Sequence, residues 1–507
     1  MRKYDAMSKS IPKNYYVFFG QNGWTKKFHE VFKTISGVTD GLRVSGLIAS
    51  ERLLIANQRD QSECDFYGDI DCLPSLLNKF SDYSNSLDEI ASLESELDIN
   101  FWRFLYAERR FIRHHHRRKY VSHEFTHSEL ANLACCMAKF FEEKLEGVDC
   151  VVMQNPSSGW SYLLALLAVK RGIKLRAVRS LGLPNHSAIW GFTPFEEYAD
   201  VNELFFKYRD GLMIPSELQE TAKGTIEKFI KTQEGPAWLA AADTQASLRW
   251  NMFFQKSKHL LERLFSGNFL SPSRFYSPMT VFQEKIKFKL RKRYYRFVLK
   301  GKYDEQEPKQ KFAVFFLSVE PESAISVNAE NCFNQLALIE NIARQLPINW
   351  KLYVKEHPVM FGWRPSSFYS TLKKIPNVSL VTPESNAGEL SKKSQLVMTI
   401  NGSVGLEAAL NKIPVITFGK SLYNELSSVI HCQDMNSIYS CIKKTKTVVH
   451  DDDEYVSFLS ALTKFSFPCP YDYHWGIDDN NPDKVLEYKS VTENLANSLL
   501  NTFKAER

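Results

Sequence analysis

Lys355, Glu356 and His357 follow directly after the apolar run Leu352–Val354. An ammonium group or an imidazole can hold phosphate oxygens through charge-assisted hydrogen bonds. Pro358 fixes the backbone after them and biases His357 toward an extended conformation. We predict a phosphate-containing ligand at Lys355, Glu356 and His357, with a polar turn at the end of a strand as the alternative.

A second segment, residues 399–410, runs from an apolar stretch through small residues into a helical pattern. The start of a helix carries unpaired N–H groups and a partial positive charge, which suits phosphate. Gly402 allows close approach of a ligand, and Asn401 and Ser403 flank it. Glu407, one turn later, could accept hydrogen bonds from sugar hydroxyls. The alternative is a capped turn followed by a solvated carboxylate.

Two glutamates, Glu320 and Glu322, follow a third apolar run, Phe312–Leu317. Carboxylates at the end of a strand can orient hydroxyl groups or accept a proton as a general base. Glutamates are also common on exposed loops that have no chemical role. We name Glu320 and Glu322 as the candidate catalytic residues.

Short apolar runs alternate with helical patterns around these segments, which is typical of an α/β fold with parallel sheets. Ligands of open α/β sheets bind outside the carboxyl ends of the strands. We therefore expect the loops at Lys355–His357 and Gly402–Ser403 to follow neighbouring strands and to converge. The predicted strands of this region cover residues 312–317, 350–354, 378–381, 396–400 and 415–418.

A similar order near the start predicts a first Rossmann-like domain, with strands at 15–19, 150–153 and 174–178. A final helix is predicted at 491–503, packing back on that first domain. The predicted divisions are a first domain (1–230), a helical basic insertion (231–308), a second Rossmann-like domain (309–445) and a C-terminal tail (446–507).

The composition suits a globular protein of two domains, because 44% of the 507 residues are hydrophobic. A net charge of +6 is small for this length, so a protein that coats nucleic acid is not expected. Nine scattered cysteines without a CxxC pair predict reduced thiols and no zinc site. The polar first residues and the short apolar runs predict a cytoplasmic protein.

The chain has two segments rich in basic residues or histidine. Lys285–Lys302 holds nine Lys or Arg, four aromatic residues and no acidic residue. It could be a solvated helical face, a surface that rests on anionic lipid, or an RNA-binding surface. His114–His116 predicts a basic patch and no metal, because consecutive histidines on a helix point in different directions. His186 is a further site candidate, although a structural role is more common for such a histidine.

The region from Phe312 to Tyr423 resembles the capsular polysaccharide synthesis family, which includes the bacterial Kdo transferases of capsule assembly. The resemblance covers little more than a fifth of the chain, with specific order and spacing. The matching motifs are Val319–Glu322, Lys355–Pro358, Ile375–Val381, Asn401–Ala408 and Pro414–Gly419, followed by Tyr423.

This resemblance implies a GT-B glycosyltransferase, in which two Rossmann-like domains face a cleft. The second domain would bind a nucleotide sugar, with CMP-Kdo as one candidate, and the first a glycan or glycolipid acceptor. His357 would contact the donor phosphate, while Gly402–Ser403 and Glu407 would surround the nucleotide or sugar. No metal or other cofactor is expected, and the enzyme would work in the cytoplasm or at the inner face of the cell membrane, with no nucleic acid as partner.

One departure leaves the stereochemistry open. Many retaining GT-B enzymes carry a Glu-x7-Glu pair, but Thr399 stands eight residues before Glu407. A nucleotide-sugar epimerase, a teichoic-acid-type polymerase and a non-catalytic polysaccharide-assembly protein are the alternatives to a hexosyl- or Kdo-type transferase.

Overall fold

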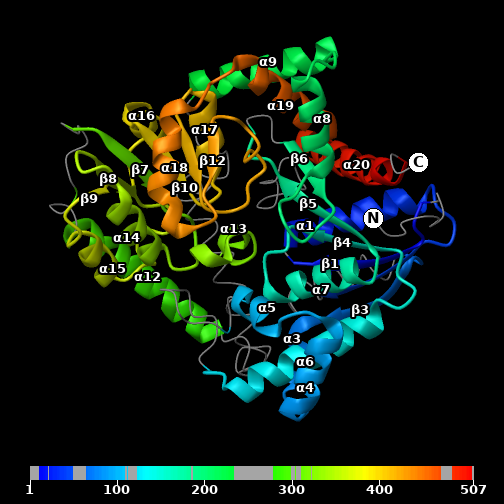
Figure 1. Ribbon diagram of the computed structural model, residues 1–507. Helices are drawn as coiled ribbons and strands as arrows, with labels where there is room; N and C mark the ends of the chain where they lie inside the picture. The colour runs from blue at the N-terminus through cyan, green and yellow to red at the C-terminus, as the bar shows by residue number, and fades with distance from the viewer. Residues whose placement is uncertain are drawn as a thin grey trace.

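A computed structural model gives the fold of the chain. The structure describes residues 11–20, 22–49, 64–108, 111, 123–183, 187–232, 278–298, 303, 310–320, 322–469 and 482–504. His114–His116, His186 and the acidic segment 304–308 lie outside the described residues. Two sheets occupy separate halves of the molecule (Figure 1).

The first sheet has seven strands in the order β13-β6-β5-β4-β1-β2-β3. The five strands from β5 to β3 are parallel, while β6 and β13 add an antiparallel edge. The bounds are β1 Asn14–Phe19, β2 Arg43–Ile48, β3 Tyr67–Cys72, β4 Cys150–Gln154, β5 Lys174–Ser180, β6 Ser187–Gly191 and β13 Phe467–Pro468.

Helices cover both faces of this sheet because its strands are apolar on both sides. Tyr15, Val17 and Phe19 share an apolar cluster with α1 and α20, whereas Tyr16 and Phe18 pack on the opposite side. The helices are α1 Asn22–Ser36 and α20 Pro482–Lys504 on the first side, and α3 Leu73–Phe80, α4 Leu87–Leu97, α5 Phe101–Ala107, α6 His127–Lys144 and α7 Gly159–Lys170 on the second.

The second sheet has six parallel strands in the order β12-β11-β10-β7-β8-β9. The chain starts at the central β7, runs outward to β9, and returns to β10 on the other side of β7. The carboxyl ends of β7 and β10 therefore flank the point where the strand order reverses. The bounds are β7 Phe312–Phe316, β8 Lys351–Lys355, β9 Val378–Val381, β10 Leu396–Thr399, β11 Val415–Thr417 and β12 Val429–His431.

The two faces of the second sheet pack against different sets of helices. Val314 and Phe316 join an apolar cluster with one set, and Ala313 and Phe315 join a cluster with the other. The first set is α8 Ala199–Arg209, α9 Ser216–Thr232, α17 Ser403–Leu410 and α19 Asp452–Phe465; the second includes α12 Pro278–Val298, α14 Gln335–Gln345, α15 Ser366–Leu372 and α18 Ile438–Lys444. Two short helices, α13 Ser323–Ser326 and α16 Ala387–Lys393, complete the domain.

Segments distant in sequence cross between the two halves. α8 and α9 pack on α19, and α9 also contacts α17, so the helices just before residue 230 lie against the second sheet. After α19 the chain supplies β13 to the first sheet, and α20 then packs on α1. Figure 1 shows α8, α9 and α19 together above the two sheets.

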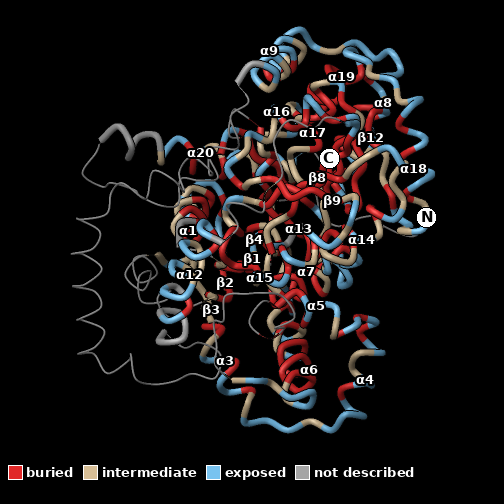
Figure 2. Tube along the Cα trace, turned by 90° about the vertical axis from the view of Figure 1, so that its left-hand side faces the viewer, coloured by how far each residue is buried: buried red, intermediate tan, exposed pale blue. Residues whose placement is uncertain are grey.

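The predicted α/β class with two Rossmann-like, mainly parallel sheets is confirmed. Buried residues concentrate in the two sheets and the helices directly on them (Figure 2). None of the helices in the described part of the chain combines the length and the apolarity needed to cross a bilayer.

Candidate functional site

The polar loops after β7, β8 and β10 lie at the carboxyl edge of the second sheet. One prediction about them was wrong: β8 and β10 are not neighbours, because β7 lies between them. The regular crossovers allow β10 to return on either side of β7, and sequence order does not decide between them. The loop after β7 is consequently the central one, with Lys355–His357 on one side and Gly402–Ser403 on the other.

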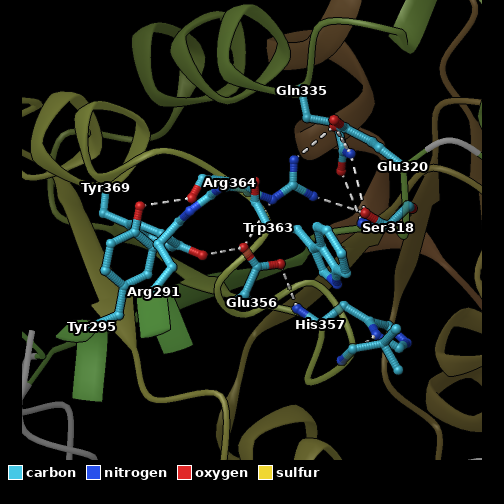
Figure 3. Close-up of polar contacts among 11 residues, drawn as sticks. Arg291, Tyr295, Ser318, Glu320, Gln335, Glu356, His357, Trp363, Arg364 and Tyr369 are labelled. Carbon is cyan, nitrogen blue, oxygen red and sulfur yellow. Dashed lines mark hydrogen bonds and ion pairs between the residues drawn. The ribbon is translucent and has the colours of Figure 1, made fainter. Parts of the chain in front are cut away.

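A buried arginine, Arg364, joins the first two loops (Figure 3). Its Nη1 lies 2.8 Å from Oε1 of Glu320, after β7, and its Nε lies 2.8 Å from Oε2 of Glu356, after β8. Its Nη2 donates to the carbonyl oxygen of Ser318 at 2.9 Å. The Arg364 side chain is 0% exposed, and the two carboxylates are 4% and 1% exposed. One guanidinium therefore fixes two strand ends.

Further donors complete the coordination of the two carboxylates. Gln335, the first residue of α14, donates to Glu320, and Tyr369 Oη donates to Glu356 Oε2 at 2.8 Å. Burial alone would lower the pKa of Arg364, but Glu356 and Glu320 raise it above its ordinary value. Burial, followed by Glu356, raises the pKa of Tyr369, so Tyr369 remains a hydroxyl donor.

This network changes the roles expected for the acidic residues. Glu320, predicted as a catalytic residue, lies in a buried ion pair that positions the loop. Glu356, predicted as a ligand contact, accepts from Arg364 and Tyr369 and from the N–H of His357 at 2.7 Å. Glu322 is exposed and lies at the start of α13, where its carbonyl oxygen accepts from Ile325 N–H at 3.0 Å.

The loop after β8 changes the pKa values of Lys355 and His357. The Lys355 ammonium is buried and donates to the Pro383 carbonyl oxygen, after β9, at 3.1 Å. Burial lowers the pKa of Lys355 to about 8, and burial followed by Lys355 and Arg364 lowers the pKa of His357 to about 4. His357 Nδ1 accepts from Val359 N–H at 3.2 Å, so the neutral ring carries its proton on Nε2. His357 is therefore a neutral N–H donor at pH 7.

The start of α17 forms the other side of the edge. Gly402 N–H donates to Thr399 Oγ1 at 3.1 Å, and the carbonyl oxygen of Gly402 accepts from the Tyr423 hydroxyl. Ser403 Oγ donates to Glu407 Oε1 at 3.4 Å, and burial raises the pKa of Glu407. Gly402 is the N-cap and has no side chain to cap the helix, and within the first turn the Gly405 N–H donates to the Gly402 carbonyl oxygen at 3.0 Å.

Tyr423 explains why a glycine stands at position 405. A Cβ there would lie 2.3 Å from Tyr423 Oη, which is too close for any side chain. Asn401, the remaining predicted contact, is half-buried and directly precedes the N-cap Gly402. The structure therefore brings Asn401, Gly402, Ser403 and Glu407 together at one helix start.

The first domain faces this edge. A Cβ at Gly182, in the loop after β5, would lie 3.6 Å from the Cβ of Ser403. Ser158, in the loop between β4 and α7, caps α7 by accepting from Ser161 N–H at 3.3 Å. Within the described ranges, no three His, Cys, Asp or Glu side chains form a group that could hold a metal ion.

Three contributors, Arg364, Tyr369 and Gln335, were not identified from the sequence. The available signal is weak: Arg364 directly follows the largely apolar segment 359–363, where a buried cation would need carboxylate partners. Gln335 and Tyr369 carry no such signal, because each lies on an ordinary amphipathic helix.

All of these site residues fall within residues 270–427, which match the family described as "Capsule polysaccharide biosynthesis protein". The resemblance to the capsule polysaccharide synthesis family is confirmed. No curated protein matches the chain.

Solved structures similar to the chain include two forms of KpsC from Thermosulfurimonas dismutans. For the beta Kdo 2,7 transferase the identity is 12%, the TM-score is 0.35, and the match covers 72% of this chain and 89% of that one. For the beta Kdo 2,4 transferase the identity is 16% and the TM-score is 0.34, and the match covers 68% of this chain and 88% of that one. UDP-GlcNAc 2-epimerase from Neisseria meningitidis matches at 12% identity and a TM-score of 0.23, over 89% of this chain and 98% of that one. We base the functional proposal on the site and on the matched family segment.

Proposed function

We propose that the protein is a glycosyltransferase that moves a sugar from a nucleotide-activated donor to a growing surface or capsular polysaccharide. The observation that carries the proposal is the carboxyl edge of the second sheet. There, the start of α17 follows β10 at the point of strand reversal, and a neutral histidine donor follows β8 on the other side of β7, within the segment that matches the capsule family. This is the place where open α/β sheets bind nucleotides.

In this proposal the α17 start holds the donor phosphate. The first-turn amides and the helix dipole favour an anion, and the glycine at 402 lets the phosphate approach the backbone. His357 Nε2–H is a second donor, from the other side of β7. Glu407, which already accepts from Ser403 one turn into α17, would accept from a ribose or sugar hydroxyl.

The same groups would assist the reaction itself. Cleavage of the sugar–phosphate bond leaves negative charge on the departing nucleotide phosphate, and preorganised donors stabilise that charge. Lys355, mostly protonated at pH 7, adds positive charge beneath the loop. The Arg364 network holds the loops after β7 and β8, and with them His357, and a rigid site loses little energy to reorganisation during the reaction.

Transfer can be tested with CMP-Kdo and other sugar nucleotides, each with a short capsular oligosaccharide as acceptor. We expect release of free nucleotide that depends on the acceptor, together with an acceptor heavier by one sugar. His357→Ala should reduce the rate, and His450→Ala, a histidine away from this edge, is the matched control. Conversion of the donor to an isomer without acceptor would instead identify an epimerase. Binding of donor with no turnover would identify a non-catalytic assembly protein.

A further inference from the structure

One helix of the second domain, α12, carries apolar side chains on its outward face. Ile286, Leu290, Tyr294 and Phe297 are spaced by four, four and three residues, which places them on one side of a helix. Leu290 is 64% and Phe297 84% exposed, and the other two are about half exposed. Exposed apolar side chains are ordinary singly, but a continuous strip of four on one helix marks a contact surface.

The opposite face of α12 explains why this strip points outward. Phe288 stacks on Trp363 with ring centroids 4.1 Å apart and an interplanar angle of 13°. Tyr295 is buried and donates through Oη to the Arg364 carbonyl oxygen at 3.0 Å. These inward contacts hold the helix against the loop before α15, and Figure 1 shows α12 beside α14 and α15. The apolar strip is consequently on the face of α12 that points away from these contacts.

Basic side chains border the strip along its length. Four of them are exposed: Lys287, Lys289, Arg293 and Arg296. The only acidic residue of the helix, Glu284, is buried on the inward face, where it pairs with Lys287 at 3.2 Å and with Arg291 at 3.9 Å. The outward face therefore combines apolar groups with positive charge alone.

We infer that this face of α12 rests on an anionic lipid bilayer. A helix lying in the membrane interface buries its apolar strip at the boundary of the headgroups and acyl chains, while flanking Lys and Arg meet the acidic headgroups. A protein partner would need acidic groups on both sides of an apolar ridge, whereas a lipid surface offers both chemistries together. RNA would use the charge but leave aliphatic Ile286 and Leu290 without a partner.

Vesicle flotation of the full chain tests this surface. We expect the protein to float with phosphatidylcholine vesicles that contain phosphatidylglycerol, and much less with phosphatidylcholine alone. Leu290→Ser/Phe297→Ser should weaken partitioning about tenfold or more, because two large apolar groups no longer enter the interface. Lys289→Gln/Arg293→Gln should weaken binding to the anionic vesicles about tenfold, with high salt reducing the difference.

Matched controls use side chains of the same types elsewhere. Met213→Ser/Ile348→Ser removes two exposed apolar groups, and Lys444→Gln/Lys446→Gln removes two exposed charges; neither should change flotation. Unchanged melting temperatures check that every variant is folded. Absence of flotation by the wild type, or equal losses in the controls, would overturn the inference. So would light scattering that shows a wild-type dimer dissociated by Leu290→Ser/Phe297→Ser, because the strip would then join two copies of the chain.

Discussion

A single buried cation organises the candidate site at the scale of residues. Arg364 satisfies two carboxylates that come from different strand ends, and neither carboxylate could remain buried and charged without it. Glu320 is therefore held by this ion pair at the end of β7. The sequence identified both loops, but it could not show which side chains turn inward, because that depends on the fold of residues 359–369.

Replacing Arg364 should therefore destabilise the second domain strongly. Arg364→Met leaves two carboxylates buried without a counter-charge, and we expect a loss of about 3–5 kcal/mol in the free energy of unfolding. Urea denaturation of the variant and the wild type measures this difference in the free energy of unfolding. Arg344→Met, at an exposed position on α14, should cost less than about 0.5 kcal/mol. Adding Glu320→Gln and Glu356→Gln to Arg364→Met should recover part of the loss; equal stability of Arg364→Met and the wild type would contradict the network.

His357 gives a pH dependence of stability with a defined sign. Its pKa is about 4 in the folded chain, against an ordinary value near 6.5. As the pH falls from 6.5 toward 4, His357 becomes protonated in the unfolded chain but stays neutral in the folded chain. The free energy of unfolding therefore falls over this range. Between pH 7 and pH 5, the free energy of unfolding should fall by about 1–2 kcal/mol less in His357→Gln than in the wild type.

The measurement is the unfolding midpoint of wild type and His357→Gln between pH 7.5 and about 4.5. His127→Gln, which removes an exposed imidazole from α6, controls for the loss of a histidine. Parallel curves for the wild type and His357→Gln would show that the His357 ring is not buried as described.

At the scale of elements, strands were predicted well because buried parallel strands are continuous apolar runs. The predicted runs 312–317 and 378–381 match β7 and β9 to within a residue. Strand order was not predictable, since the same alternation fits a return of the chain on either side of β7. The wrong prediction that β8 and β10 are neighbours follows from this ambiguity. In the structure the centre of the site lies between β7 and β10.

The fit of α17 against Tyr423 is testable with one methyl group. Gly405→Ala would drive a Cβ into Tyr423 Oη, detach that hydroxyl from Gly402, and cost about 1–3 kcal/mol. Gly224→Ala is the matched control on α9, where a Cβ meets nothing within 4 Å, and it should stabilise by up to about 1 kcal/mol. Thermal unfolding compares the two, and similar shifts in melting temperature would show that α17 is not held in this way.

At the scale of the whole molecule, aromatic and charged contacts join the two domains. The Phe195 ring, after β6, lies 5.5 Å from the Arg103 guanidinium and 4.6 Å from the Lys420 ammonium. Arg103 pairs with Glu330 at 2.6 Å, and Lys420 pairs with Glu197. These partners lie in different halves of the chain, and no local pattern predicts such pairs from sequence.

Phe195 should therefore help to hold the domains together through its contact with Lys420. We expect Phe195→Ala to increase the radius of gyration measured by small-angle X-ray scattering, because the cation–π contact with Lys420, which crosses between the domains, is lost. Phe192→Ala, in the same loop but facing Arg176 of the first domain, should leave the radius unchanged. A radius that is the same for both variants and the wild type would assign the closed arrangement to other contacts.

The proposed phosphate site at the start of α17 can be tested directly with one substitution. Ser403→Asp places a carboxylate at the phosphate position while remaining favourable at a helix N-terminus. Thermal shifts with CMP, UDP, GDP, TDP and ADP should show one nucleotide that stabilises the wild type. That shift should also occur in Ser216→Asp, at the first residue of α9, and should be absent in a folded Ser403→Asp variant. A full shift in Ser403→Asp would rule out phosphate binding at the start of α17.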